Sequence, residues 1–235
     1  MNGKKQWLDH ALVVLVLVSG LLACDQNHAS GTPRAEPATS IPLPQPVLTG
    51  QTSLEELLAR RRSVREFDNE PLTAADLGQL LWAAQGITNS RGFRTAPSAG
   101  ALYPLELYVA TVEGVFHYDP HNHQLLVTSH SDARMDLYQA ALSQEPVRQA
   151  PAVFIVTAIY ERTAQKYGDE RTPRYVHLEA GHAAQNLLLE AVALGLGAVP
   201  IGAFYDEAIQ KALGLPTDHT PLYLIPVGHK VGTSP

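Results

Sequence analysis

Periodic apolar residues predict a series of helices along the chain. Residues 53–56 and 73–76 both have the pattern of a capping box, so helices are expected to begin at Leu54 and directly after Thr73. Gly86 can end the second of these helices. Further helices are expected at residues 131–142 and 206–213. The longest lies within residues 178–204 and is apolar on nearly every face, so we expect it to be buried on most faces.

Other apolar residues alternate or run continuously, as is typical of strands. Residues 106–111 alternate, and residues 114–118 and 124–129 flank a polar turn, which predicts a hairpin. The unbroken apolar run Ala152–Ile159 indicates a strand buried on both faces. Shorter strands are expected at 198–201 and 222–227, and the polar segment 162–174 is expected to be irregular and exposed. This order predicts an α+β fold with helices packed on a mixed sheet.

The first 23 residues have the layout of a secretory signal peptide. Two lysines precede an apolar run, and the 13 residues from Ala11 to Ala23 are fewer than the ~20 that a membrane-spanning helix needs. The sequence Leu-Leu-Ala-Cys that ends at Cys24 resembles the lipobox of bacterial lipoproteins, whose cysteine becomes the acylated first residue. The alternative is an uncleaved anchor helix.

Residues 24–50 are expected to form a flexible tether, because small residues and prolines dominate and large apolar residues are few before Ile41. The remaining residues, 51–235, have a suitable length for one folded domain. Cys24 is the only cysteine, so no disulfide within the chain can compete for it. The sequence therefore predicts a lipid-anchored protein of the cell envelope, on the outer, periplasmic side of the cytoplasmic membrane.

Composition narrows the classes of function. A net charge of −6 argues against nucleic acid as a partner. No Gly-x-Gly-x-x-Gly pattern follows a strand, and neither a Walker loop nor a Gly-x-Ser-x-Gly pattern occurs. If the protein uses a nicotinamide nucleotide, this nucleotide is therefore expected to bind transiently, without a binding domain of its own.

Arg61, Ser63 and Arg65 alternate directly after the first predicted helix. In an extended segment these three side chains share one side, while Arg62 and Val64 point the other way. Two guanidinium groups and a hydroxyl suit a phosphate, because Arg binds it through bidentate, charge-assisted hydrogen bonds. The alternative is a basic, solvated helix end that complements the helix dipole.

Two further segments combine Gly, Pro and small residues. Pro97, Ser98, Ala99 and Gly100 predict a loop whose backbone could approach a flat ring closely. Residues 195–203 follow the long helix and end in a small-residue turn, which could offer a main-chain N–H without bulk. The alternative is that these glycines serve only to end a helix and enter a strand.

The long helix carries polar residues on one side. Glu179, His182, Gln185 and Asn186 have spacings that could place them on one face, where a buried hydrogen-bond network is expected. A metal site from Glu179 and His182 lacks a third ligand, so no metal is predicted. The histidines around the hairpin, His117 among them, are expected to be surface residues.

Taken together, the segments 60–67 (RRRSVREF), 96–104 (APSAGALYP) and 178–204 resemble the FMN-dependent nitroreductase family. The resemblance extends from about Leu54 to Val231 and is strongest to the SagB/ThcOx-type dehydrogenase branch. It implies a nitroreductase-like sandwich, built as a homodimer with FMN at the interface. Members of this branch that oxidise azoline rings also use particular Lys and Tyr residues, which the sequence alone does not place here.

The resemblance assigns cofactor-binding roles to individual residues. Arg61, Ser63 and Arg65 match positions that hold the FMN phosphate and ribityl chain, and Lys230 matches a basic residue near the phosphate. The loop of Pro97, Ser98, Ala99 and Gly100 is expected to line the isoalloxazine ring from the partner subunit. The turn of Pro200, Ile201, Gly202 and Ala203 is expected to approach flavin N5, where many relatives have Glu-Gly instead of Gly202-Ala203. Gln144, or Ser143 beside it, matches a polar flavin contact.

Two classes of function follow from these assignments. The first is an FMN oxidoreductase that transfers hydride or electrons to or from a small organic or peptide-derived substrate. Within this class, substrate dehydrogenation and reduction of nitroaromatics or quinones by NAD(P)H both stay open. The second class is a lipoprotein that binds flavin without catalysis.

Overall fold

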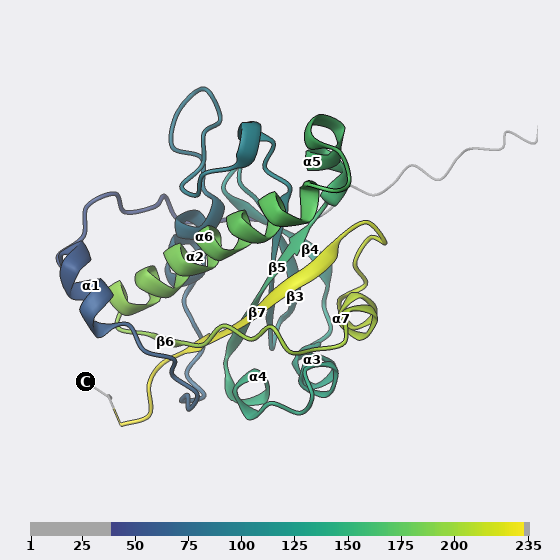
Figure 1. Cartoon of the computed structure of the whole chain (residues 1–235). Helices are drawn as coiled ribbons and strands as arrows, with labels where there is room; N and C mark the ends of the chain where they lie inside the picture. Colours follow the sequence, from purple (N-terminus) through teal and green to yellow (C-terminus); the bar gives the residue numbers. More distant parts are fainter. Residues whose placement is uncertain (1–38, 233–235) are drawn as a thin grey trace, which may run out of the picture. The chain divides into compact units, whose positions relative to one another are not determined.

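A seven-stranded sheet forms the centre of the protein (Figure 1). The structure, a computed structural model, describes residues 39–232, so the predicted signal peptide and Cys24 lie outside the described residues. The strands follow the order β1-β4-β3-β2-β5-β7-β6. Their bounds are β1 Ser40–Pro42, β2 Leu105–Thr111, β3 Gly114–Asp119, β4 Gln124–Ser129, β5 Ala152–Ala158, β6 Gly197–Ala198 and β7 Thr220–Gly228.

All pairs of named strands are antiparallel. The sheet is therefore antiparallel and not mixed as predicted. Within residues 39–232, parallel pairing is confined to an isolated bridge between Ser63 and Ala198. The chain returns through hairpins and through helices that reverse its direction, so neighbouring strands run in opposite directions.

Helices cover both faces of the sheet. The two longest, α2 and α6, pack against each other and on one face, while α3, α4 and α7 pack on the other (Figure 1). The helices are α1 Leu54–Arg60, α2 Ala74–Gln85, α3 Arg134–Ala140, α4 Glu145–Gln149, α5 Tyr160–Tyr167, α6 Thr172–Ala193 and α7 Asp206–Leu213, with a 3₁₀ turn at Ala99–Ala101. This arrangement confirms the predicted α+β fold.

The central strand β5 separates two hydrophobic cores. Phe154 and Val156 belong to the core under α2 and α6, whereas Val153 and Ile155 belong to the core under α3, α4 and α7. All residues of β5 are buried, which confirms the strand predicted from the unbroken apolar run 152–159. Neither α2 nor α6, nor any other helix within residues 39–232, has the length and hydropathy that crossing a bilayer requires.

The start of the described chain is part of the folded body. Strand β1 pairs with β4, Leu43 is buried, and Val47 exchanges two hydrogen bonds with the Gln79 side chain, at 2.8 and 3.0 Å. The prediction that the tether continues to residue 50 is therefore wrong for residues 40–47. Three residues suffice to extend the sheet at its edge, and so short a run of apolar residues gives little sequence signal.

The segment 162–174 is also more regular than predicted. It contains most of α5 and the first residues of α6. Helix α5 has few apolar residues, and polar contacts hold it against the rest of the fold. Arg162 donates to the Tyr103 carbonyl at 3.0 Å and forms an ion pair with Glu106. A helix that is held by polar contacts lacks the apolar periodicity on which the sequence prediction depended.

Candidate functional site

Residues 61–67 form an extended segment along the edge of the sheet. The N–H of Val64 donates to the Ala198 carbonyl at 3.0 Å, which fixes the segment beside β6. Phe67 bridges to Lys230, and the N–H of Asp68 donates to the His229 carbonyl at 3.0 Å. The structure thus brings the predicted phosphate ligands of residues 61–65 to the same edge as Lys230.

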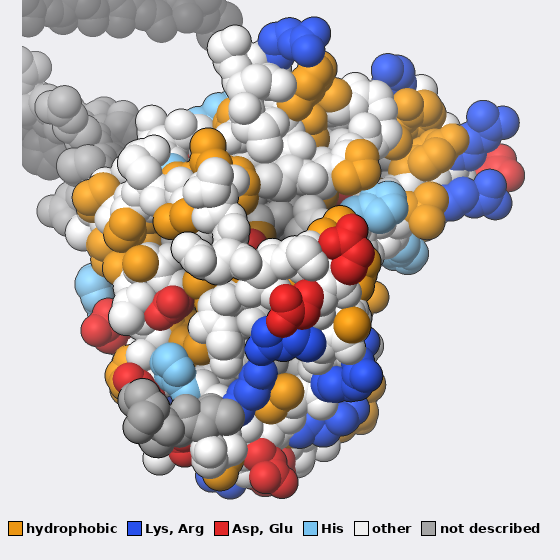
Figure 2. Space-filling view, turned by 90° about the vertical axis from the view of Figure 1, so that its left-hand side faces the viewer, with side chains coloured by type: hydrophobic (Ala, Val, Ile, Leu, Met, Phe, Trp, Pro, Cys, Tyr) orange, Lys and Arg blue, Asp and Glu red, His pale blue; other side chains and the backbone are white. Residues whose placement is uncertain are grey.

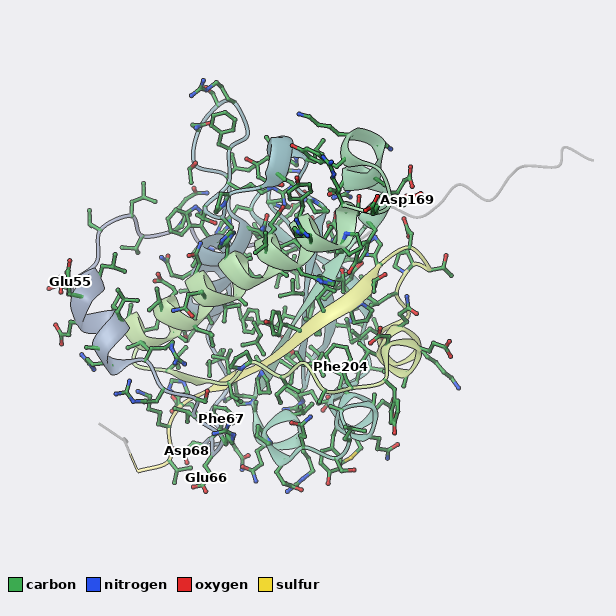
Figure 3. The ribbon with its side chains drawn as sticks, viewed as in Figure 1. Glu55, Glu66, Phe67, Asp68, Asp169 and Phe204 are labelled. Carbon is green, nitrogen blue, oxygen red and sulfur yellow. The ribbon has the colours of Figure 1, made fainter. Side chains whose placement is uncertain are left out.

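Burial along this segment alternates only from Ser63 to Arg65, since Phe67 is buried two residues later and Arg62 is exposed. Val64 packs against the core and Phe67 is buried, whereas Ser63 and Arg65 are exposed and Arg61 is half-buried. Glu66, Phe67 and Asp68 lie beside the end of β7 (Figure 3). Close approach to β6 depends on Gly197, because a Cβ there would lie 2.6 Å from a methyl group of Val64.

The neighbouring arginines, Arg60 and Arg62, form contacts at the end of helix α1. Arg60 forms an ion pair with Glu56 at 2.9 Å, and Arg62 donates to the carbonyls of Ala59 and Arg61 at 3.0 and 2.7 Å. Within residues 39–232, the structure gives no hydrogen bond or ion pair to the side chains of Arg61 and Arg65. Lys and Arg side chains gather on this face beside acidic ones (Figure 2). The helix end therefore engages Arg60 and Arg62 but not the alternating pair Arg61 and Arg65.

The turn at residues 200–203 lies farther along the same side of the sheet. Ile201 pairs with Leu224 of β7, after which Gly202 and Ala203 are exposed. A Cβ at Gly202 would have no atom within 4 Å, so the space in front of the turn is open. Gln144 donates to the Ala203 carbonyl at 2.9 Å, which joins two residues that the sequence analysis had selected separately.

Backbone strain occurs beside this turn. Leu142 and Ser143, which precede Gln144, have φ values of 57° and 55°. Residues other than Gly and Asn pay a steric cost in this region, and such strain clusters at functional sites. Gln144 also donates to the Ala141 carbonyl at 3.0 Å, so the strained turn is locked to Ala203.

The loop of Pro97–Gly100 lies apart from these residues. It packs against α5 and α6, above α6 in Figure 1, whereas the segment 61–67 lies below α6. Gly100 has a φ of 65°, and a Cβ there would lie 2.9 Å from Lys166 Nζ and 3.0 Å from the Tyr167 hydroxyl. Lys166 and Tyr167 are functional candidates that the sequence analysis missed, because it interpreted their segment as irregular.

A buried polar cluster lies behind that loop. Glu179 of α6 is only 2% exposed; burial raises the pKa of its carboxyl to about 7, although Ser98, Arg94 and Gln85 lower it in part. The predicted network of four residues on α6 is only partly formed. Asn186 donates to the Thr95 carbonyl at 3.3 Å, but His182 is exposed.

A second cluster contains a histidine that the sequence analysis placed on the surface. His117 bonds to Glu106 at 2.7 Å and stacks on Tyr108 with 4.5 Å between ring centroids. The Tyr108 hydroxyl in turn bonds to Nδ1 of His219 at 2.8 Å, and His219 is 7% exposed. Glu106 and Tyr108 share one face of β2, and this i, i+2 pair of polar groups could have indicated partners on the neighbouring strand.

The geometry of these residues can be compared with what the parts of FMN require of a binding site. The donors at the β6 edge suit a dianionic phosphate, the exposed small-residue turn suits a flat ring, and Gln144 orients the turn between them. The residues present therefore fit FMN. Within residues 39–232, no three His, Cys, Asp or Glu residues gather closely enough to hold a metal ion.

The chain is similar to known proteins over most of its length. The model of the nitroreductase family matches residues 58–229. Two similar proteins are described as putative nitroreductases. MJ1384 of Methanocaldococcus jannaschii is 47% identical over 77% of this chain and 93% of its own length. A protein of Ralstonia eutropha, known as a crystal structure, is 32% identical with a TM-score of 0.76, over 82% of this chain and 90% of its own.

Two other relatives have more specific names. The trifolitoxin-processing protein TfxB of Rhizobium leguminosarum is 34% identical over 52% of this chain and 35% of its own length. The NADPH:FMN oxidoreductase of Vibrio harveyi, solved in complex with NAD+, shares the fold at 23% identity, with a TM-score of 0.58 over 77% of this chain and 71% of its own.

Proposed function

Because the chain belongs to the nitroreductase family, we propose that it is an FMN-dependent oxidoreductase of the SagB/ThcOx-type dehydrogenase branch. The observation that carries this proposal is the edge of the sheet where Arg61, Ser63 and Arg65 lie beside Lys230 and the exposed turn 202–203. The name of the Vibrio harveyi protein, which includes FMN, supports the choice of cofactor.

The residues at the β6 edge would hold the phosphate end of the cofactor. Arg61 and Arg65 supply planar guanidinium groups, Ser63 supplies a hydroxyl, and Lys230 adds a positive charge. Pairing with β6 fixes the backbone of this segment before any ligand arrives, which reduces the entropy lost on binding.

The turn at Pro200–Ala203 would support the ring. FMN, when bound, supplies the transfer of hydride or electrons, and the protein supplies orientation and electrostatics. A main-chain N–H of Gly202 or Ala203 can donate to the ring without a side chain that blocks its face. Gln144 restrains this turn through the Ala203 carbonyl.

The loop Pro97–Gly100 lies on the other side of α6 from the β6 edge (Figure 1), so it is assigned to a different half of the site. We propose that a homodimer brings the loop of a second copy to the ring, and dimers are typical of the family. Lys166 and Tyr167 adjoin Gly100 and are the ionisable groups next to this loop. They are therefore our candidates to hold or move a proton at the substrate.

The substrate is proposed to be a small organic or peptide-derived molecule. TfxB, a protein named for toxin processing, favours a peptide-derived substrate and its dehydrogenation. The alternative is reduction of nitroaromatics or quinones by NAD(P)H, which the NAD+ complex of the Vibrio harveyi relative favours. A flavin-binding lipoprotein without turnover would bind FMN but would show no bleaching with any donor.

We also propose that Cys24 carries a lipid anchor on the outer side of the cytoplasmic membrane. The lipobox pattern before Cys24 is the observation that motivates this. Labelled palmitate in the full chain, absent from Cys24→Ala, would support it; equal labelling of both would refute it.

Titration with FMN tests the cofactor assignment directly. The full chain is expected to quench FMN fluorescence on binding, and Arg61→Ala combined with Arg65→Ala is expected to weaken binding by at least about 100-fold, because two charge-assisted contacts of roughly 1.5–3 kcal/mol each are lost. Arg171→Ala combined with Lys211→Ala removes the same charge from exposed positions elsewhere and should leave the affinity unchanged. Equal FMN affinity in both double variants would contradict the phosphate assignment.

A further inference from the structure

The Glu179 carboxyl occupies a closed position between α6, α2 and the loop 94–103. Glu179 is 2% exposed and Gln85 of α2 is 1% exposed. Glu179 Oε1 and Gln85 Nε2 are both buried without a hydrogen-bond partner. A buried, unpartnered polar atom is costly, and an ionised one is far more so.

The loop in front of this carboxyl is held by a chain of polar contacts. Arg94 donates to Gln85 Oε1 at 2.9 Å, and its guanidinium group lies 4.7 Å from the centroid of the Tyr103 ring. Ser98 Oγ accepts the N–H of Tyr103 at 2.9 Å, which closes the Pro97–Gly100 turn. The loop is therefore defined by the same side chains, Arg94 and Ser98, that adjoin Glu179.

An ionised Glu179 would disturb these contacts. The carboxylate would have to admit water or attract the Arg94 guanidinium, and Arg94 already holds Gln85 and Tyr103. Ser98, Arg94 and Gln85 lower the pKa of Glu179, but burial raises it more, so the closed loop favours the uncharged acid. An uncharged acid keeps the contacts as the structure has them.

We propose that Glu179 is a positioning residue for the loop 94–103, which packs closed over the buried carboxyl while it is uncharged and opens to water when it ionises. For the role of this loop beside the flavin the inference rests on the proposed function; for the loop's own motion it does not.

The surroundings of Glu179 set the direction of its pH dependence. The groups that face it are Gln85 from α2 and Arg94 and Ser98 from the loop, of which only Arg94 carries a charge. Glu106, Arg162 and Tyr103 act on Arg94 in turn. Burial is the largest effect and raises the pKa of Glu179 to about 7. The uncharged form of Glu179 therefore holds the loop 94–103 closed in acid. This contribution is lost as the pH rises through the pKa of Glu179.

Hydrogen exchange of residues 94–103 in the full chain without flavin tests this directly. We expect exchange in the wild type, relative to Glu179→Gln at the same pH, to accelerate at least about tenfold between pH 5 and pH 7.5. The amide of the variant is neutral throughout, so intrinsic effects of pH cancel in the ratio. A ratio that does not change with pH would overturn the proposal.

Two controls separate this role from a merely structural one. Glu190→Gln removes another carboxyl from α6 whose pKa burial also raises, and this variant should keep the wild-type pH dependence of the loop. Residues 152–158 of β5 serve as an internal reference whose exchange should not follow Glu179. A Glu190→Gln variant that loses the pH dependence would refute the assignment to Glu179.

FMN affinity provides a second measurement. The wild type should bind FMN several-fold more weakly at pH 7.5 than at pH 5.5 relative to Glu179→Gln, and equal ratios at the two pH values would contradict the loop's role beside the flavin. A wild type that binds no FMN at any pH would instead refute the proposed function, and the exchange measurement would still decide the role of Glu179.

Discussion

At the scale of single residues, the contacts among polar groups beneath the loops could not be predicted from the sequence. His117 was expected on the surface, yet it bonds to Glu106 and stacks on Tyr108. The strand pattern alone predicts that Glu106 and Tyr108 share a face, but the register that brings His117 opposite Tyr108 depends on the whole sheet. Arg162 completes the cluster from a helix that the sequence analysis did not predict.

Glu106→Gln is expected to destabilise the protein by about 1–3 kcal/mol at pH 7 in urea denaturation, because a half-buried carboxylate that pairs with Arg162 and accepts from His117 loses its charge. Burial raises the pKa of Glu106, but the His117 hydrogen bond and the Arg162 charge lower it further, below its ordinary value. This contribution is present above the ordinary pKa and is lost as the pH falls through the folded value. The gap between wild type and variant should therefore shrink at pH 3.

A surface carboxyl provides the comparison for Glu106. Glu145→Gln removes an exposed partner of Arg148 and should change the unfolding transition far less. Equal effects of the two substitutions, or a gap for Glu106→Gln that widens in acid, would show that the buried cluster is not the source of the stabilisation.

At the scale of helices and strands, local signals predicted the elements that have strong patterns of their own. The capping box of residues 73–76 is present at the start of α2, and the buried run 152–159 is β5. The elements that sequence analysis missed, β1 and α5, depend on partners distant in the chain. Strand β1 needs the edge of β4, and α5 needs Glu106 and the Tyr103 carbonyl.

The contact between residues 61–65 and β6 is predicted to be sensitive to one methyl group. Gly197→Ala would place a Cβ 2.6 Å from Val64, so the segment must move away from β6. We expect a loss of about 1–3 kcal/mol in unfolding free energy, together with weaker FMN binding, in denaturation and fluorescence titrations.

Gly50→Ala is the matched control for this change. Beyond its chain neighbours, the nearest atom to the added Cβ is the Thr52 carbonyl oxygen at 3.9 Å, which is ordinary contact, so stability and FMN binding should be retained. A Gly197→Ala variant that binds FMN as tightly as Gly50→Ala would show that the β6 edge does not organise the phosphate ligands.

At the scale of the whole molecule, the candidate residues form two groups that one chain keeps apart. The fold could be predicted from sequence motifs, and the family resemblance implied that the Pro97–Gly100 loop acts from a partner subunit. The separation of the two groups along α6 could not be predicted from the residues themselves, because spacing in the sequence carries no information on distance in the fold. Large apolar side chains are exposed near α1, including Leu48 at 74% and Leu54 at 58%. They adjoin a cavity of about 490 Å³ between residues 44–57, α2 and the end of α6.

Leu54→Glu combined with Leu58→Glu should therefore convert the proposed homodimer into monomers, since exposed apolar surface of this kind marks an interface. Light scattering coupled to size exclusion measures the mass, and FMN titration should show binding weakened together with dimerisation. Val112→Glu, at a residue that is 59% exposed on the turn between β2 and β3, should leave the dimer intact. A dimer that persists in the double variant would locate the interface elsewhere.

The bridge between Phe67 and Lys230 has a consequence for biosynthesis. Strand β7, which flanks β5 at the centre of the sheet, and the lysine beside the arginines are both translated more than 150 residues after the arginines themselves. This edge can close only in a chain that extends through β7 to Lys230. Chains that end before residue 220 should therefore bind no cofactor, even though they contain all the arginines.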